Sequence, residues 1–305
     1  MDGQKQNIDI AMATDANYLQ HACVAIASLV KNTNANLHIY ILEEHLSDKH
    51  KSILNKLKSI REFELDFIYV GDEYFKDWDF KRNDWSKAIY YRLALPSLIK
   101  RLDKVIYLDC DLVVMKDIQE LWNTDLSEVY AAAVEAKVEP ALKKALGLEA
   151  DYPYFNSGVM VFNLKKMRTD NIEQEFIEKY ESLFNVLKYP DQDILNVVFK
   201  NKYRILPLNW NLISSVYRNI PDYLSYDSAA VSDALSNPAV AHFTGRHKPW
   251  RVLKTSRHPC WREYWKYLRL TPFKTKYYTL GLIKFVLTGR LKKPAAKKVW
   301  KDFKP

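Results

Sequence analysis

The sequence predicts an α/β fold with a parallel sheet and crossover helices. Short apolar runs of strand length alternate with segments whose apolar residues recur at helical spacing, and carboxylates follow several of the runs. Strands separated by helices pair in parallel, because a parallel pair needs a long crossover connection. With 305 residues, of which 48% are apolar, the chain can bury a sizeable core in one large domain or two ordinary ones.

The alternation is clearest in the first half of the chain. An apolar run over residues 7–15 is followed by apolar residues at helical spacing over 17–33. The next expected strands and helices lie in turn at 36–44, 47–60, 64–71, 86–99 and 103–114. Asp15, Asp109 and Asp111 fall at the carboxyl ends of strands, which is where parallel sheets carry their sites.

The pattern loosens after residue 125. We expect strands at 129–136 and 154–164, an acidic helix at 172–184, a helix that opens near 191, and mostly loop with short strands at 203–247. The seven glycines form neither G-x-G-x-x-G nor G-x-x-x-x-G-K-S/T, and no serine stands in G-x-S-x-G. The dinucleotide fingerprint, the P-loop and the hydrolase elbow are therefore absent.

Positive charge is concentrated at the end of the chain. Residues 266–305 contain twelve Lys or Arg residues and one acid, whereas the whole chain carries +9, so residues 1–265 sum to about −2. The main body is therefore not a basic nucleic-acid-binding surface. The sequence starts without a secretory signal pattern, it has no long apolar run that would span a membrane, and its three scattered cysteines suggest a reducing compartment.

Two carboxylates, Asp109 and Asp111, stand inside the apolar run VIYLDCDLVV. Burying unpaired carboxylates is costly and two of them repel, so the run needs a compensating charge. Residues two apart share one face of a strand, and convergent carboxylates suit Mn²⁺ or Mg²⁺, which take oxygen ligands. A pair of solvated turn aspartates is the structural alternative.

An Asp-x-Asp pair at a strand end fits two classes of enzyme. In a phosphatase of the haloacid dehalogenase type the first Asp is a nucleophile, whereas in a nucleotide-sugar glycosyltransferase both hold a metal that bridges a diphosphate. The segment VAHFTGRHKPW favours the second class. His242 is a suitable third ligand, Gly245 lets backbone approach an anion, and Lys248 supplies positive charge. A non-catalytic module that binds a sugar nucleotide or a membrane is a further alternative.

Two more polar segments are candidates for sugar recognition. The apolar run YFNSGVMVFNL is interrupted by three small residues, Asn156, Ser157 and Gly158. A bulge in the strand would also explain them. A predicted helix starts with three polar residues, Asp191, Gln192 and Asp193. Acids in a first helical turn also serve as caps and compensate the helix dipole.

These segments together resemble glycosyltransferase family 8, which contains bacterial lipopolysaccharide galactosyl- and glucosyltransferases and glycogenin. Six segments match in the family's order from residue 8 to about residue 265: AMATDANYLQHACVAIASL, YYRLALPSLI, DKVIYLDCDLVVMKDIQELW, YFNSGVMVFNLKKMR, YPDQDILNVVF and VAHFTGRHKPW. The lipooligosaccharide α-1,4-galactosyltransferase type is the most similar. The resemblance implies a GT-A fold over residues 1–265, with a single Rossmann-like mixed sheet flanked by helices, and a basic helical tail over 266–305.

The resemblance also implies retaining transfer of a hexose from a UDP-sugar with Mn²⁺, or with Mg²⁺ in its place. The implied metal ligands are Asp109, Asp111 and His242. The implied donor-binding residues are Ala13, Asp15, Asn17 and Tyr18 for the nucleoside, Gly245 and Lys248 for the diphosphate, and Arg92, Asn156, Ser157, Asp191 and Gln192 for the sugar. The implied catalytic residues are Asp191, Gln192 and Asp193. Glu135 stands where galactosyltransferase-type relatives have Asp, near the donor and acceptor sugars.

Retention follows either from front-face attack by the acceptor or from a covalent intermediate. Gln192 is a poor nucleophile because an amide oxygen is barely basic, so front-face attack is preferred and an intermediate on Asp193 comes second. UDP-galactose is the first choice of donor and UDP-glucose the next. Self-glucosylation on a tyrosine, as in glycogenin, stays open because the chain has 20 tyrosines.

The tail over residues 266–305 mixes aromatic and aliphatic residues with Lys and Arg. Such a segment cannot span a bilayer but can lie on an anionic leaflet, where each basic residue contributes about 1 kcal/mol. We expect peripheral attachment to the inner, cytoplasmic face of the cell membrane, beside a saccharide or lipid-linked glycan acceptor. A solvated basic tail and a nucleic-acid contact are the alternatives.

Overall fold

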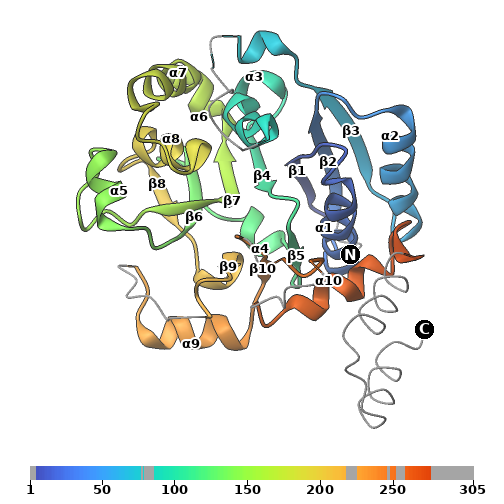
Figure 1. Cartoon of the computed structure of the whole chain (residues 1–305). Coiled ribbons are helices and arrows are strands. Elements are labelled where there is room, and N and C mark those ends of the chain that lie inside the picture. Colours follow the sequence, from blue (N-terminus) through green and yellow to red (C-terminus); the bar gives the residue numbers. More distant parts are fainter. Residues whose placement is uncertain are drawn as a thin grey trace.

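The computed structural model describes residues 5–76, 78, 86–217, 225–245, 248–251 and 258–275. Within these residues a seven-stranded sheet has the spatial order β3 (Glu64–Tyr69), β2 (Asn36–Glu43), β1 (Asn7–Ala13), β4 (Lys104–Leu108), β7 (Phe155–Asn163), β6 (Ala131–Glu135), β8 (Tyr203–Ile205) (Figure 1). A three-stranded sheet has the order β5 (Leu112–Val114), β10 (Val240–His242), β9 (Leu212–Ile213).

The central sheet is mixed. β1 pairs in parallel with β2 and β4, and β2 with β3, as the alternation of strands and helices predicts. β7 runs antiparallel to both β4 and β6, so the expectation of a parallel sheet is wrong in this half. β8 still pairs in parallel with β6, and α6 (Leu164–Thr169), α7 (Ile172–Leu183) and α8 (Pro190–Val198) lie between β7 and β8 in the chain. The mixed sheet is the one that the GT-A resemblance implies.

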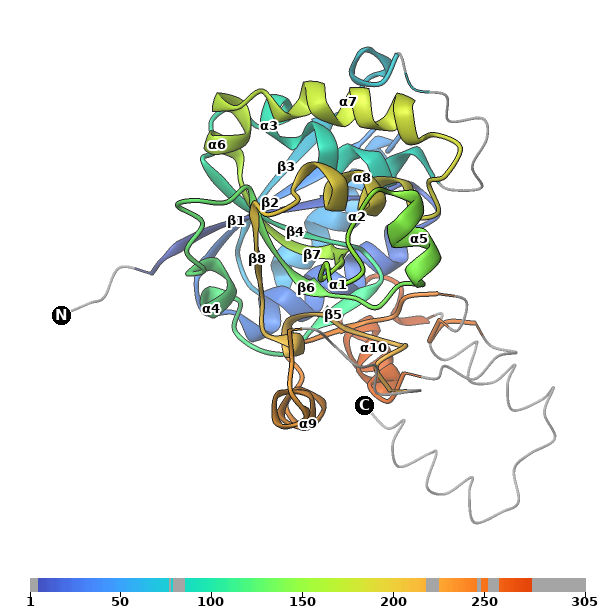
Figure 2. The ribbon, with the colours of Figure 1, turned by 90° about the vertical axis from the view of Figure 1, so that its left-hand side faces the viewer.

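Helices cover both faces of the central sheet. One face packs on α1 (Leu19–Asn32), α2 (Asp48–Asn55), the small sheet and α9 (Ser228–Ser236). The other packs on η4 (Lys87–Ala94), α3 (Leu95–Leu98), α6 (Leu164–Thr169), α7 (Ile172–Leu183) and α8 (Pro190–Val198). Figure 2 shows the sheet between the two layers. Side chains of β1 alternate between the two cores, as the period of a strand requires.

The expected strand over residues 103–114 is two strands in different sheets. β4 pairs with β1 and β7, whereas β5 pairs with β10. The chain changes sheets at residues 109–111, where Asp109 N–H donates to Gly158 O and Asp111 O accepts from Phe243 N–H. The two carboxylates therefore lie at the boundary between the sheets rather than within one strand.

The helix expected over residues 47–60 begins as α2 with a capping box, in which Ser47 and His50 bond reciprocally. Two other expectations are met only in part. The expected helix over 86–99 is mostly 3₁₀ helix, η4, before α3 begins. The region 203–247 contains the expected short strands β8, β9 and β10, but it also contains the 3₁₀ helix η5 (Leu208–Asn211) and α9, which were not expected. α9 is capped by Asp227, and it buries Val231 and Ala234.

The remaining elements are short, except for a helix near the end of the described chain. The short ones are η1 (Lys56–Ser59), η2 (Asp72–Tyr74), α4 (Gln119–Trp122) and α5 (Pro140–Ala145). α10 (Trp261–Leu268) packs Tyr264 and Tyr267 in one cluster with α1 and spans the expected boundary at residue 265. Residues 276–305, which contain most of the expected tail, lie outside the described residues. None of the helices described is long and apolar enough to cross a membrane.

Candidate functional site

The two sheets bring the three expected metal ligands together. β10 pairs with β5 so that His242 lies opposite Leu112, which places the imidazole beside Asp111. His242 Nε2 lies 3.0 Å from Asp111 Oδ1 and 3.7 Å from Asp109 Oδ2. One ligand atom from each of the three residues lies within 4.8 Å of the others. Two carboxylates and an imidazole nitrogen fit a divalent cation such as Mn²⁺.

This group lies at the topological switch point of the sheet. The chain passes from β1 to β2 on one side and later returns to β4 on the other side of β1. The carboxyl ends of two such strands leave a crevice that commonly binds ligands. Cys110 Sγ donates a hydrogen bond of 3.0 Å to Ala13 O, so the turn with both aspartates is tied to the end of β1.

Arg92 links the metal group to the expected sugar-binding residues. Its guanidinium is buried, with Nη2 2.7 Å from Asp109 Oδ1 and Nε 3.2 Å from Asp191 Oδ2. Nη1 donates to Ser157 O at 2.6 Å. The planar fork therefore holds two carboxylates and one carbonyl in a fixed relation.

Asp111 lies between a lysine and a histidine. Lys248 Nζ forms an ion pair with Asp111 Oδ2, while His242 lies against Oδ1. Burial acts to raise the pKa of Asp111, but Lys248, with His242 beside it, holds that pKa well below its ordinary value. Asp111 is therefore ionised at neutral pH, as a metal ligand must be.

The pKa of Asp191 is shifted in the opposite direction from that of Asp111. Burial raises its pKa to about 6; Arg92 opposes this effect and the negative charge of Asp109 adds to it. Ser157 Oγ donates to Asp191 Oδ2 at 2.9 Å. Asp191 is thus an acceptor at neutral pH whose charge is lost in mild acid.

The amide of Gln192 lies between β7 and α8. Its Oε1 accepts from Asn156 Nδ2 at 2.6 Å and from Ser157 N–H at 3.2 Å, and its Nε2 donates to Tyr154 OH at 3.0 Å. The pairing of β6 with β7 shifts register between Ala133 and Glu135, opposite this stretch. The strand bulge that the sequence left open as an alternative is therefore present. Asn156 and Ser157 in this bulge also contact Gln192, near the start of α8.

Asp193 is fully buried and fully bonded. Its Oδ1 accepts from Tyr154 OH, and its Oδ2 accepts from the backbone N–H groups of Lys188 and Tyr189 at 2.7 and 2.8 Å. These bonds tie Asp193, in the first turns of α8, to the two residues that precede the helix.

The expected nucleoside residues lie at the carboxyl end of β1 and in the turn that follows it. Asp15 Oδ1 accepts from the N–H groups of Asn17 and Tyr18, both at 2.9 Å. Tyr18 is 41% exposed, and an exposed aromatic ring can stack on a base. Burial raises the pKa of Tyr18, with weaker effects from the charges of Lys248 and Asp111, which places the phenol near the metal group.

Two positions in this region favour glycine, each for a different structural reason. Gly245 has φ +77°, a conformation that favours glycine. At Gly158 the reason is close approach, because a Cβ there would lie 2.2 Å from His242 Cε1 and 2.6 Å from Asp109 Oδ2. Sequence reasoning had suggested sugar contacts for Gly158, although a lone glycine inside a strand already signals a close approach.

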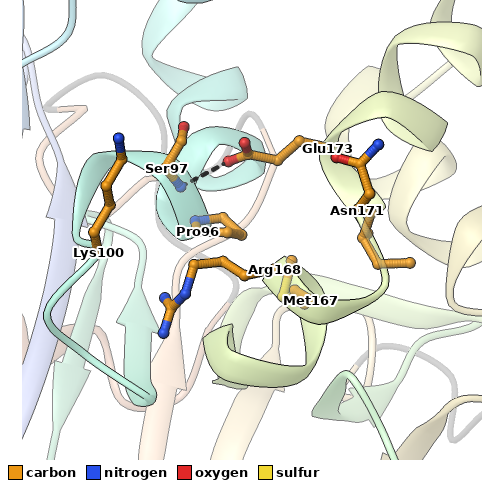
Figure 3. A pocket seen from close by; sticks show the side chains of 8 residues that line it. Pro96, Ser97, Lys100, Met167, Arg168, Asn171 and Glu173 are labelled. Atoms are coloured by element: carbon orange, nitrogen blue, oxygen red, sulfur yellow. Dashed lines mark hydrogen bonds between the residues drawn. The ribbon is translucent and has the colours of Figure 1, made fainter.

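A separate cavity of about 280 Å³ lies among α3, α6 and the start of α7 (Figure 3). Glu173 accepts from Ser97 N–H at 2.9 Å across it. Its lining residues are Pro96, Ser97, Lys100, Met167, Arg168, Asn171, Ile172 and Glu173. None of the residues expected to bind metal or donor is among them, so this cavity is distinct from the site above.

The mixed sheet, with an Asp-x-Asp and histidine group at its switch point, is the GT-A arrangement. The chain belongs to glycosyltransferase family 8, whose family model, Glycosyl transferase family 8, matches residues 9–254. Both the family and the fold class expected from the sequence are confirmed. The phosphatase alternative gives no role to His242, whose Nε2 lies beside both Asp109 and Asp111.

Individual relatives agree with this assignment. A lipopolysaccharide 1,2-glucosyltransferase of Escherichia coli K12 is 31% identical over 275 residues, which cover 88% of this chain and 79% of that protein. A putative glycosyltransferase of Haemophilus influenzae is 36% identical over 211 residues, 68% of this chain and 63% of the relative, so the match spans less than two thirds of its length. The structure of galactosyltransferase LgtC in complex with donor and acceptor sugar analogues matches with a TM-score of 0.76 and 26% identity, over 87% of this chain and 96% of that one.

Gly158→Ala tests the close approach of β7 to the metal ligands. The added Cβ must displace His242 or Asp109, so we expect affinity for Mn²⁺ to fall at least about tenfold. Calorimetric titration with Mn²⁺ measures the effect. Gly147→Ala is the matched control, since a Cβ there meets nothing within 4 Å and any backbone strain arises far from the ligands. Unchanged affinity in Gly158→Ala would contradict the packing described.

The pKa of Asp191 predicts a pH dependence of sugar binding. A carboxyl with a folded-state pKa of about 6 takes up a proton as the pH falls through that value, and it then loses its charge toward Arg92 and its capacity to accept from hydroxyls. We expect the affinity ratio of UDP-galactose to UDP in the wild type, divided by the same ratio in Asp191→Asn, to fall about tenfold from pH 7 to pH 5. The variant removes the titration of the metal ligands and of the terminal phosphate of UDP from the comparison, because both proteins share them. Equal pH dependence of the ratio in the two proteins would refute the assignment.

Proposed function

We propose that this protein is a retaining hexosyltransferase that moves galactose or glucose from a UDP-sugar to a saccharide or lipid-linked glycan acceptor with Mn²⁺. The observation that carries the proposal is the convergence of Asp109, Asp111 and His242 at the switch point of the sheet. Bound there, Mn²⁺ supplies Lewis-acid stabilisation of the charge that develops on the leaving UDP. Lys248, beside Asp111, adds a positive charge for the same diphosphate.

The residues around Arg92 suit the sugar of the donor. Asp191 is ionised at neutral pH and accepts hydrogen bonds from hydroxyls, while Arg92 fixes its position relative to Asp109. Asn156 and Gln192 add amide groups next to it. Because galactose and glucose differ at one hydroxyl, small changes in these contacts decide between them. UDP-galactose is the first choice and UDP-glucose the second.

Front-face attack is the mechanism that these contacts support. A covalent intermediate needs a free carboxylate, and both oxygens of the buried Asp193 already accept hydrogen bonds. Gln192 is barely nucleophilic as an amide. In front-face attack the acceptor oxygen bonds to the anomeric carbon as its bond to the diphosphate breaks. The acceptor proton passes to a phosphate oxygen of the departing UDP, so no protein nucleophile is needed.

Membrane attachment through residues 266–305 is part of the proposal. The described residues around the start of this region, 261–275, support it. Trp261 and Leu270 of α10 and the turn after it are 36% and 44% exposed, next to exposed basic side chains, those of Arg262, Lys266 and Lys274. Aromatic and aliphatic groups among basic ones suit the surface of an anionic leaflet, such as the inner face of a cell membrane.

The donor is identified by measuring UDP release from a panel of UDP-sugars with and without Mn²⁺. We expect slow hydrolysis of one UDP-hexose that needs Mn²⁺ and drops at least about a hundredfold in Asp111→Asn, which loses a ligand charge. Asp233→Asn, on the exposed face of α9, is the control and should behave as wild type. Hydrolysis that survives in Asp111→Asn would contradict the proposal. Release of phosphate from phosphomonoesters would favour the phosphatase alternative.

Deletion of residues 276–305 tests the membrane attachment. The deletion keeps every residue of the described fold, including the buried Thr271 and the packed Phe273. We expect at least tenfold weaker sedimentation with vesicles that contain phosphatidylserine, because most of the basic charge is lost. Hydrolysis of the UDP-sugar should stay within about twofold. Equal binding of truncated and full-length protein to these vesicles would refute this part.

A further inference from the structure

An unbroken series of hydrogen bonds joins the metal ligand His242 to Gln192. His242 Nδ1 lies 2.9 Å from Asn211 Oδ1, and Asn211 Nδ2 donates to Asn156 Oδ1 at 2.7 Å. Asn156 Nδ2 donates to Gln192 Oε1 at 2.6 Å. Asn211 is 1% exposed and does not belong to the residues that the sequence suggested for metal or donor binding. In this series the amide of Asn211 stands between the imidazole of His242 and the amides of Asn156 and Gln192.

Two backbone N–H groups of β7 decide which way each amide points. Gly158 N–H donates to Asn156 Oδ1 at 3.1 Å, and Ser157 N–H donates to Gln192 Oε1 at 3.2 Å. A backbone N–H can only donate, so both contacted atoms must be the amide oxygens. Asn156 therefore presents an oxygen to Asn211, and Asn211 must turn its NH₂ group toward Asn156.

The orientation of Asn211 decides the state of the imidazole. With its NH₂ group toward Asn156, Asn211 presents its oxygen to His242 Nδ1. Only an N–H can donate to that oxygen, so Nδ1 carries the proton and a neutral ring has its lone pair on Nε2. Nε2 is the atom that faces Asp111 and Asp109. β9 and β10 hold this arrangement, because they pair in parallel and Asn211 directly precedes β9.

We propose that Asn211 is a positioning residue that transmits the orientation set by the backbone of β7 to His242 and keeps Nε2 ready to bind the metal. The inference rests on the proposed function, because it takes the cation as part of the site. Outer partners of a ligating histidine fix its ring and its tautomer, and their loss commonly costs 10- to 100-fold in metal affinity. Asn211 acts through His242 and is not itself a ligand.

Two substitutions of Asn211 separate its possible roles. Asn211→Leu keeps the approximate volume and removes the acceptor from Nδ1. Asn211→Asp keeps an acceptor for Nδ1 but removes the donor to Asn156. Asn163→Leu is the control, because Asn163 also bonds through its side chain but lies at the opposite end of β7 from residues 156–158. The readouts are affinity for Mn²⁺ by calorimetry and the coupling of Mn²⁺ to a directly bound ¹⁴N by pulsed electron paramagnetic resonance.

We expect one ¹⁴N coupling in the wild type, with the coupling and the affinity preserved within about threefold in Asn211→Asp and Asn163→Leu. Asn211→Leu should lose the coupling and bind Mn²⁺ at least tenfold more weakly. Wild-type coupling that persists in Asn211→Leu at equal affinity would overturn this inference and leave the proposed function standing. If Asn211→Leu fails to fold, loss of the coupling in Asn211→Asp would overturn it instead. A wild type without Mn²⁺ binding would overturn both.

Discussion

The site depends on how two neighbouring carboxylates are paired with cations at the boundary of two sheets. Each has its own cation: Arg92 bonds to Asp109, and Lys248 bonds to Asp111. Without these cations, repulsion between the aspartates and their loss of hydration would oppose placing the two side chains side by side. The ion pairs hold two sets of oxygen ligands together, and the imidazole of His242 completes a set suited to a divalent cation.

This constraint explains the local backbone. The chain leaves the central sheet after β4 and joins the small sheet at β5. Both carboxylates therefore lie between the two strands, at the boundary of the two sheets. β7 must pass close to them, which requires the absence of a side chain at Gly158. The same stretch of β7 provides the N–H groups that orient Asn156 and Gln192. One strand, β7, therefore contacts both the expected metal ligands and the amides that we propose for sugar binding.

Much of this arrangement could be predicted from the sequence, because it depends on local patterns. The apolar runs located the strands, and the carboxylates at their ends located the ligands. The direction of β7 and the division between β4 and β5 could not be predicted, since both depend on pairing between distant segments. Asn211 was missed for the same reason. Its partners His242 and Asn156 lie 31 and 55 positions away, and a lone asparagine carries no signal in the sequence.

The affinity for UDP in the presence of Mn²⁺, compared with that in excess EDTA, tests the central claim most directly. If Asp109, Asp111 and His242 hold a cation that the diphosphate needs, chelation should weaken UDP binding at least tenfold, about 1.4 kcal/mol. Restoring Mn²⁺ should restore the affinity in the same sample. UDP that binds equally well in EDTA would show that the three side chains do not form the metal centre of a nucleotide site.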